Sequence, residues 1–351
     1  MDKEKKDVIR EISFSPDGKK ILFNRSFDHG PYMIHVYDLE KGELAAYQSP
    51  KGETWGDARY SFDGKRIVFI TMPLIGDKGN KADPAHWQIA VMDPDGKNVR
   101  KITKTTGLKL YPSFSHSGRK IIFTRADVIR ESGHTPAADY DVYEVDVATG
   151  RETRLTQFRF FSMSRPYFFP DDKTFIFGGE HPFSYPAVPN SDRNPHIMGK
   201  IREELESKYY HHSIYVMQGN EKELKPYLVM PEYIKKFKSY SAPACEYSRQ
   251  PALSADGSVL IFESIGYKSD GSAEGWQFYQ YSADGNHRRI TLHAKPIWDE
   301  AVSSNGELLA VVHNVAPSRD INNIVIYRVS DGTIYKDIIL PDQSSRIING
   351  N

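Results

Sequence analysis

The sequence predicts an all-β protein, a six-bladed β-propeller of four-stranded antiparallel blades. Three observations support this prediction: a ten-residue motif recurs six times, a second turn-containing motif follows each copy, and the 351 residues accommodate six such units. The first copy reads FSPDGKKILF at residues 14–23. The other five are YSFDGKRIVF (60–69), FSHSGRKIIF (114–123), FFPDDKTFIF (168–177), LSADGSVLIF (253–262) and VSSNGELLAV (302–311).

The first motif has the composition of a β-hairpin. Pro16 and Asp17 favour a type I turn, because proline fixes φ and aspartate bonds its own backbone. Gly18 supplies the left-handed residue that closes such a loop, and an apolar return strand follows. In the fourth copy Asp172 replaces this glycine. Since aspartate tolerates a left-handed backbone better than most residues, we expect a variant turn there.

The second motif predicts another hairpin. Residues 34–44, IHVYDLEKGEL, read as strand, glycine turn and strand. The equivalents are IAVMDPDGKNV (89–99), VYEVDVATGRE (142–152), IYVMQGNEKEL (214–224), FYQYSADGNHR (278–288) and VIYRVSDGTIY (325–335). A single domain is therefore expected over 1–351, with blades at approximately 8–48, 56–104, 110–157, 164–229, 250–293 and 298–340. A β-sandwich does not explain six self-similar units.

These motifs carry a resemblance to a known family. SPDGKKILF followed by IHVYDLEKGE resembles the TolB-like, WD40-like (PD40) propeller repeat, and the resemblance covers almost the whole chain. It implies the propeller fold and, more loosely, the bacterial periplasm or cell envelope, with the cytoplasm as the alternative. The chain has no room for the amino-terminal α/β domain of TolB. It also has neither room for an α/β-hydrolase domain nor the G-x-S-x-G motif of prolyl-oligopeptidase-type peptidases.

Composition limits the classes of function. Lys plus Arg equals Asp plus Glu, so no global field attracts nucleic acid. The single cysteine, Cys245, excludes an intrachain disulfide framework, and no apolar run is long enough to span a membrane. We expect a monomer that binds a protein or glycan ligand, with no nucleic acid, no transmembrane segment, no cofactor and no metal.

The long connections all fall on one predicted face. The two tight turns of each blade lie together on one face, so the other face carries the longer loops at about 70–88, 124–140, 178–212, 230–249 and 263–276. Binding residues collect on such loops. The longest insertion contains Pro195 at the start of a predicted amphipathic helix, with Ile197, Ile201 and Leu205 on one side. That helix would pack on the propeller or serve as a lid.

The inner strands begin on this loop-rich face, around the central channel. Four residues before each repeat's serine position stand Glu11, Asp57, Tyr111, Arg165, Gln250 and Asp299. Nearby positions add Trp55, Trp298, Arg25, Arg125, Glu180, His181, Glu263 and His313. Together they would form a polar, aromatic-edged funnel. The alternative is that a channel mouth is wet and tolerates any polar residue.

No catalytic or metal motif is present. The histidines of the fourth-blade insertion match no zinc spacing, and 270–275 lacks the calcium-loop pattern. Three hypotheses remain, of which one is a purely structural scaffold that would be insensitive to changes in the funnel; the other two assign the funnel a role. The first is a binding or scaffold module that holds a protein segment or glycan at the channel. The second is a carbohydrate lyase or hydrolase that uses funnel carboxylates, or His181 and His313, for acid–base chemistry.

Overall fold

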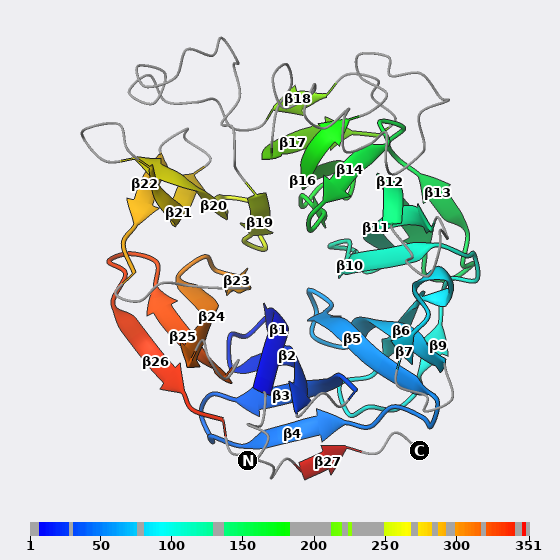
Figure 1. Ribbon diagram of the computed structural model, residues 1–351, viewed down its shortest axis with the longest axis horizontal. Helices are drawn as coiled ribbons and strands as arrows, with labels where there is room; N and C mark the ends of the chain where they lie inside the picture. The colour runs from blue at the N-terminus through cyan, green and yellow to red at the C-terminus, as the bar shows by residue number, and fades with distance from the viewer. Residues whose placement is uncertain are drawn as a thin grey trace, which may run out of the picture.

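Four-stranded antiparallel sheets radiate from a central axis, which confirms the predicted six-bladed propeller (Figure 1). The computed structural model describes residues 7–27, 31–75, 81–128, 137–182, 212–219, 224–226, 249–267, 273–282, 287–292, 299–316, 321–340 and 346–348. The helix predicted after Pro195 lies outside these residues. Among the described residues the one helical element is the 3-10 turn η1 (Pro84–His86).

Each blade runs from an inner to an outer strand. Blade 1 contains β1 (Asp7–Phe14), β2 (Lys20–Phe27), β3 (Met33–Asp38) and β4 (Leu44–Tyr47). Blade 2 contains β5 (Glu53–Tyr60), β6 (Ile67–Ile75), β8 (Gln88–Met92) and β9 (Arg100–Lys101), with β7 (Lys81–Ala82) beside β6. Blade 3 contains β10 (Leu108–Phe114), β11 (Lys120–Val128), β12 (Ala137–Asp146) and β13 (Glu152–Arg154).

The second half of the ring repeats this order. Blade 4 has an inner strand in two parts, β14 (Phe160–Met163) and β15 (Tyr167–Phe168), then β16 (Thr174–Pro182), β17 (His212–Gln218) and β18 (Lys225–Pro226). Blade 5 contains β19 (Arg249–Leu253), β20 (Val259–Tyr267), β21 (Ala273–Ser282) and β22 (His287–Ile290). Blade 6 contains β23 (Glu300–Val302), β24 (Leu308–Ala316), β25 (Ile321–Arg328) and β26 (Ile334–Ile338).

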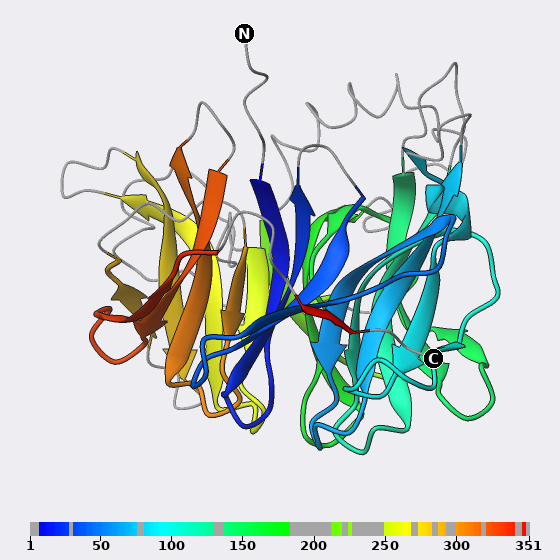
Figure 2. The same cartoon turned by 90° about the horizontal axis from the view of Figure 1, so that it is seen from below.

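The repeated turns form as their sequence predicts. Gly18 has φ +70°, and the four other glycines at this position lie between +68° and +73°. Asp172 has φ 54°, so the fourth copy makes the expected left-handed turn without glycine. In the first copy Ser15 Oγ donates to Asp17 Oδ1 at 2.6 Å, and Lys20 N donates to Ser15 Oγ at 2.9 Å. These turns lie together on the lower side of Figure 2, here named the turn face.

The hydrophobic core is divided among the contacts between blades. Successive residues of a strand point to opposite faces of its sheet, so a strand between two neighbours needs apolar residues at every position. In β2, Ile21 and Phe23 pack towards blade 6, whereas Leu22 packs towards blade 2. Six such clusters occur among the described residues, one for each pair of adjacent blades. This explains why KILF, RIVF and KIIF are nearly all apolar.

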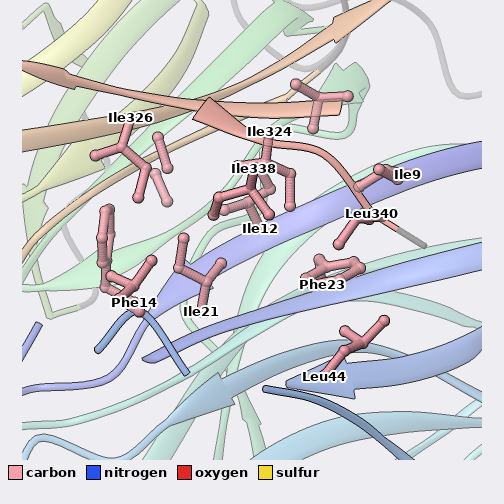
Figure 3. Close-up of a cluster of buried hydrophobic side chains, with 14 residues drawn as sticks. Ile9, Ile12, Phe14, Ile21, Phe23, Leu44, Ile324, Ile326, Ile338 and Leu340 are labelled. Atoms are coloured by element: carbon pink, nitrogen blue, oxygen red, sulfur yellow. The ribbon is translucent and has the colours of Figure 1, made fainter. Parts of the chain in front are cut away.

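The ring closes between blades 6 and 1. Ile9, Ile12 and Phe23 of blade 1 pack against Ile324 and Ile338 of blade 6 (Figure 3). A further strand, β27 (Arg346–Ile348), follows blade 6 and pairs in parallel with β4 at the outer edge of blade 1. The sequence did not predict this strand, because three residues carry no alternation and their partner lies about 300 residues away in the chain.

Candidate functional site

The inner strands carry a repeated irregularity on the loop-rich face, where they begin. The register of the first two strands shifts after Arg10 in blade 1, and equivalent shifts occur in blades 2, 3 and 5. A residue with left-handed φ occupies each bulge: Glu11 (59°), Asp57 (51°), Tyr111 (57°) and Gln250 (51°). A bulge re-aims its side chain and frees backbone groups from the ladder. The repeat position that the sequence singled out is therefore also structurally distinct.

Hydrogen bonds link the residues at this repeat position from one blade to the next. The backbone N–H of Glu11 donates to Asp299 Oδ2 of blade 6. The N–H of Asp57 donates to Glu11 Oε2 at 2.8 Å, and the N–H of Tyr111 donates to Asp57 Oδ2 at 2.5 Å. In blade 5 the N–H of Gln250 donates to Ser164 Oγ at 3.3 Å. We call the six residues the central ring: Glu11, Asp57, Tyr111, Arg165, Gln250 and Asp299.

Arg165 completes the central ring from blade 4. Its side chain is 4% exposed, and its guanidinium pairs with the Asp299 carboxylate of blade 6. Nη1 also donates to the backbone O of Glu300 at 2.6 Å and lies 3.3 Å from Glu300 Oε1. The amide nitrogen of Gln250, oriented towards the same carboxylate, donates to Glu300 Oε2 at 2.9 Å. Arg165 therefore joins blades 4 and 6 across the channel.

A second cation, Arg59, joins blades 2 and 4 through its contact with Tyr167. Arg59 lies two residues before the serine position, where the other blades have Ser13, Ser113, Tyr167, Ala252 and Ala301. Its Nη1 donates to Tyr167 Oη, and its guanidinium carbon lies 5.3 Å from the centre of the Tyr167 ring. Arg59 is not among the site residues predicted from the sequence. The signal that would have revealed it is one cation at a repeat position where four of the other five blades have serine or alanine.

The charges around the axis do not balance. Four carboxyl groups (Glu11, Asp57, Asp299 and Glu300) lie with two guanidinium groups, Arg59 and Arg165. Burial, and then the neighbouring Asp57 carboxylate, raise the pKa of Glu11 from 4.5 to about 8. Burial also raises the pKa of Asp57, against the opposing effects of Arg59 and Arg165. Both shifts favour the neutral form of a carboxyl group in this cluster, and we place the proton on Glu11.

A cavity of about 170 Å³ lies beside the central ring on the loop-rich face. We call it the blade 1–2 cavity, because most of its lining belongs to those blades. Its lining residues are Arg10, Glu11, Asn24, Tyr32, Gly56, Asp57, Ile70, Met72, Trp87 and Leu110. Asn24 Oδ1 and Trp87 Nε1 are buried atoms without a hydrogen-bond partner. The cavity thus combines two carboxyl groups, two aromatic rings and unsatisfied polar atoms.

Three other predicted site residues contact groups outside the central ring. Trp55 is 4% exposed and packs on Phe69 in the core between blades 1 and 2. Arg125 Nη1 lies 3.4 Å from Glu152 Oε2 within blade 3. His313 is buried, and its Nε2 hydrogen-bonds with Tyr327 Oη at 2.9 Å.

Five predicted residues remain. Arg25, Glu180 and Glu263 are buried in the second strands of blades 1, 4 and 5. The side chain of His181 and the whole of Trp298 lie outside the described residues.

Two features are absent from the described residues. No group of three or more His, Cys, Asp or Glu side chains is arranged there to hold a metal ion. In the same part of the chain, no helix has the length and apolar character needed to cross a membrane.

Sequence comparison gives local matches to one family. No protein-family model matches the chain. The Tol-Pal system protein TolB of Rickettsia canadensis is 33% identical over 118 residues, which cover 34% of this chain and 22% of that protein. TolB of Dinoroseobacter shibae is 25% identical over 198 residues, which cover 42% of each. The matched regions thus span less than half of these curated relatives.

Structural comparison extends the likeness to most of the chain. TolB from Acinetobacter baumannii aligns with a TM-score of 0.56 and 16% identity, over 93% of this chain and 62% of that one. An oligogalacturonate lyase in complex with manganese aligns with a TM-score of 0.54 and 15% identity, over 94% and 77%. At these identities the likeness shows the fold alone. The protein is therefore a six-bladed β-propeller. The local sequence matches and the structural alignment both make this propeller similar to TolB, and the chain covers 62% of the length of the Acinetobacter protein.

Proposed function

We propose that this propeller is a non-enzymatic binding module that holds a protein segment on its loop-rich face, with a glycan as the second ligand class. The observation that supports this most directly is the blade 1–2 cavity, which lies beside side chains of the central ring and Arg59 that join blades 2, 4 and 6. A ligand on this face would contact the central ring and the adjoining blade 1–2 cavity. Concave sites with a few convergent polar groups are the usual places for binding.

The predicted funnel residues divide into two proposed roles. Glu11 and Asp57 line the cavity, so we assign them contact with the ligand. Arg165 and Asp299 form an ion pair with each other, and we assign them the role of joining blades 4 and 6. Tyr32 and Trp87, which the sequence analysis did not select, are half-buried at the cavity and would provide stacking area.

A protein ligand is favoured by the relatives. The curated matches are named Tol-Pal system proteins, which places those proteins in a protein assembly. The same likeness supports a periplasmic location for this chain, and we propose that location on this ground alone.

Affinity capture from the source cell tests the proposal. The wild type would be compared with Tyr32→Ala/Trp87→Ala, which changes the cavity and leaves the central ring intact. Glu43→Gln, an exposed carboxyl near the turn face, is the matched control. We expect a protein retained by the wild type and the control and lost from the double variant. Equal retention by all three proteins would contradict the proposal.

A second function, carbohydrate cleavage, is favoured by one observation. A carboxyl group with a pKa of about 8 next to a cavity is suited to proton transfer near neutral pH. Glu11 would serve as acid and Asp57 as its partner. A bell-shaped pH profile on an oligosaccharide panel, abolished by Glu11→Gln, would support it. No turnover across the panel would leave the binding module as the better account.

A further inference from the structure

The polar atoms that line the blade 1–2 cavity include more hydrogen-bond acceptors than donors without a partner. Glu11 Oε2 already accepts from Asn24 Nδ2 and from the Asp57 N–H, and Glu11 Oε1 accepts no hydrogen bond among the described residues. Asn24, 3% exposed, has its Oδ1 without a partner. Asp57 Oδ1 is a second buried acceptor of the lining without a hydrogen bond, and Trp87 Nε1 is the corresponding donor among the fully buried atoms of the described lining residues. Among these buried atoms the acceptors outnumber the donor, and Glu11 Oε1 becomes a further acceptor when Glu11 ionises, so a complementary ligand brings N–H groups.

The charge and shape of the cavity narrow the ligand further. Two carboxyl groups favour a cation, and an ammonium group offers three donors and no acceptor. Ile70, Met72 and Leu110 supply an apolar wall for an alkyl chain, and the rings of Tyr32 and Trp87 suit a cation near their faces. A volume of about 170 Å³ admits a chain of a few methylene groups. Arg10, the exposed cation of the lining, has other interactions of its own.

We propose that the blade 1–2 cavity binds a primary ammonium group carried on a short aliphatic chain. This assignment rests on the proposed function, and the ammonium group would then belong to a lysine side chain of the bound protein segment. A free alkylamine offers the same chemistry. Binding places the ammonium against Glu11 Oε1 and Asn24 Oδ1, with the methylene groups against Met72 and Ile70.

This site couples ligand binding to proton release. Glu11 is faced by Asp57 and Arg59 from β5, by Asp299 before β23, and by Arg165 between β14 and β15, and Arg10 is its neighbour on β1. Because Oε2 takes two hydrogen bonds, the proton of the neutral acid sits on Oε1, where the ammonium would lie. An arriving cation displaces that proton, so affinity rises as the pH rises towards 8.

The first test uses n-butylammonium chloride as the probe and n-butanol as its neutral match. Binding is followed by the indole N–H resonance of Trp87, identified by its loss in Trp87→Phe. We expect saturable binding of n-butylammonium and none of n-butanol. Because the ionised fraction of an acid falls about tenfold per pH unit below its pKa, affinity should increase about tenfold or more from about pH 6.5 to 8.5. Equal binding of both probes, or no response to n-butylammonium, would overturn the proposal.

Variants locate the effect in the cavity. Glu11→Gln removes the charge and should weaken binding by about tenfold or more, as expected for a lost charge-assisted hydrogen bond. Since Glu11 also belongs to the central ring, Met72→Phe provides a second test that fills the cavity from its apolar side and should abolish binding. Glu43→Gln should leave affinity unchanged. Retained binding in Met72→Phe would place the probe elsewhere and refute the proposal.

The source of the ammonium is settled separately. A peptide from the captured segment is compared with the same peptide carrying norleucine in place of lysine. Loss of binding on this exchange supports the lysine source. If no segment is captured and n-butylammonium still binds, the proposed function fails and the ammonium site stands, with a free amine as its ligand. If a segment binds and n-butylammonium does not, the ammonium site fails and the binding module stands.

Discussion

The two ends of the inner strands satisfy the hydrogen bonds of their polar groups in different ways. On the turn face, Ser15, Asp17 and Gly18 satisfy one another within four residues, and Ser61 with Asp63 and Ser254 with Asp256 repeat the arrangement. On the loop-rich face, the central ring satisfies its backbone with carboxylates from neighbouring blades. The first arrangement is local and has an exposed carboxylate, whereas the second is long-range and has buried carboxyl groups. A repeat therefore has one end that folds by itself and one end that depends on the complete ring.

The largest effect is expected from Arg165→Met. This change leaves the Asp299 and Glu300 carboxyl groups buried without their cation, and breaking a buried pair from one side costs about 3–5 kcal/mol. The free energy of unfolding from chemical denaturation is the measurement. Lys19→Met, which breaks the exposed Lys19–Glu40 pair near the turn face, should show no resolvable change. Similar results for both variants would remove the distinction between the two ends.

Glu11→Gln should change the pH dependence of stability. Between pH 4.5 and about 8 the folded chain holds a proton on Glu11 that the unfolded chain has released. The contribution of this group is therefore fully present below pH 4.5 and is lost as the pH rises through about 8. We expect the free energy of unfolding of the variant to decline less over this range than that of the wild type. Glu43→Gln is the control, and a slope in Glu11→Gln equal to that of the wild type would show that Glu11 ionises normally.

A smaller, local loss is expected from Ser61→Ala. Ser61 Oγ donates to Asp63 Oδ1 at 2.6 Å and accepts from Arg66 N at 3.0 Å. Removing both bonds from a buried position should cost about 1–2 kcal/mol. Combined with Arg165→Met, the two losses should add, because the sites share no partner. A clear deviation from additivity in denaturation would mean that the two ends of the blades are coupled.

The same contrast explains which parts of the structure can be predicted from the sequence. Asp172 and the turn glycines could be predicted because their conformations follow from neighbouring residues. The position of the central ring followed from the repeat register. Its bonding did not, since Arg165 joins groups that lie more than 130 residues away in sequence. Tyr32 and Trp87 line the cavity but were not predicted, because they occupy no repeated position. Trp55 was predicted as a site residue, although it belongs to the core.

The central claim is that the loop-rich face binds a partner and the turn face does not. Photo-cross-linking in the source cell tests it directly, with the reactive amino acid placed at Tyr32 in one protein and at Lys65, exposed on the turn face, in the other. The account predicts a discrete adduct from position 32 and none from position 65. Adducts from position 65 alone, or from neither position, would contradict it.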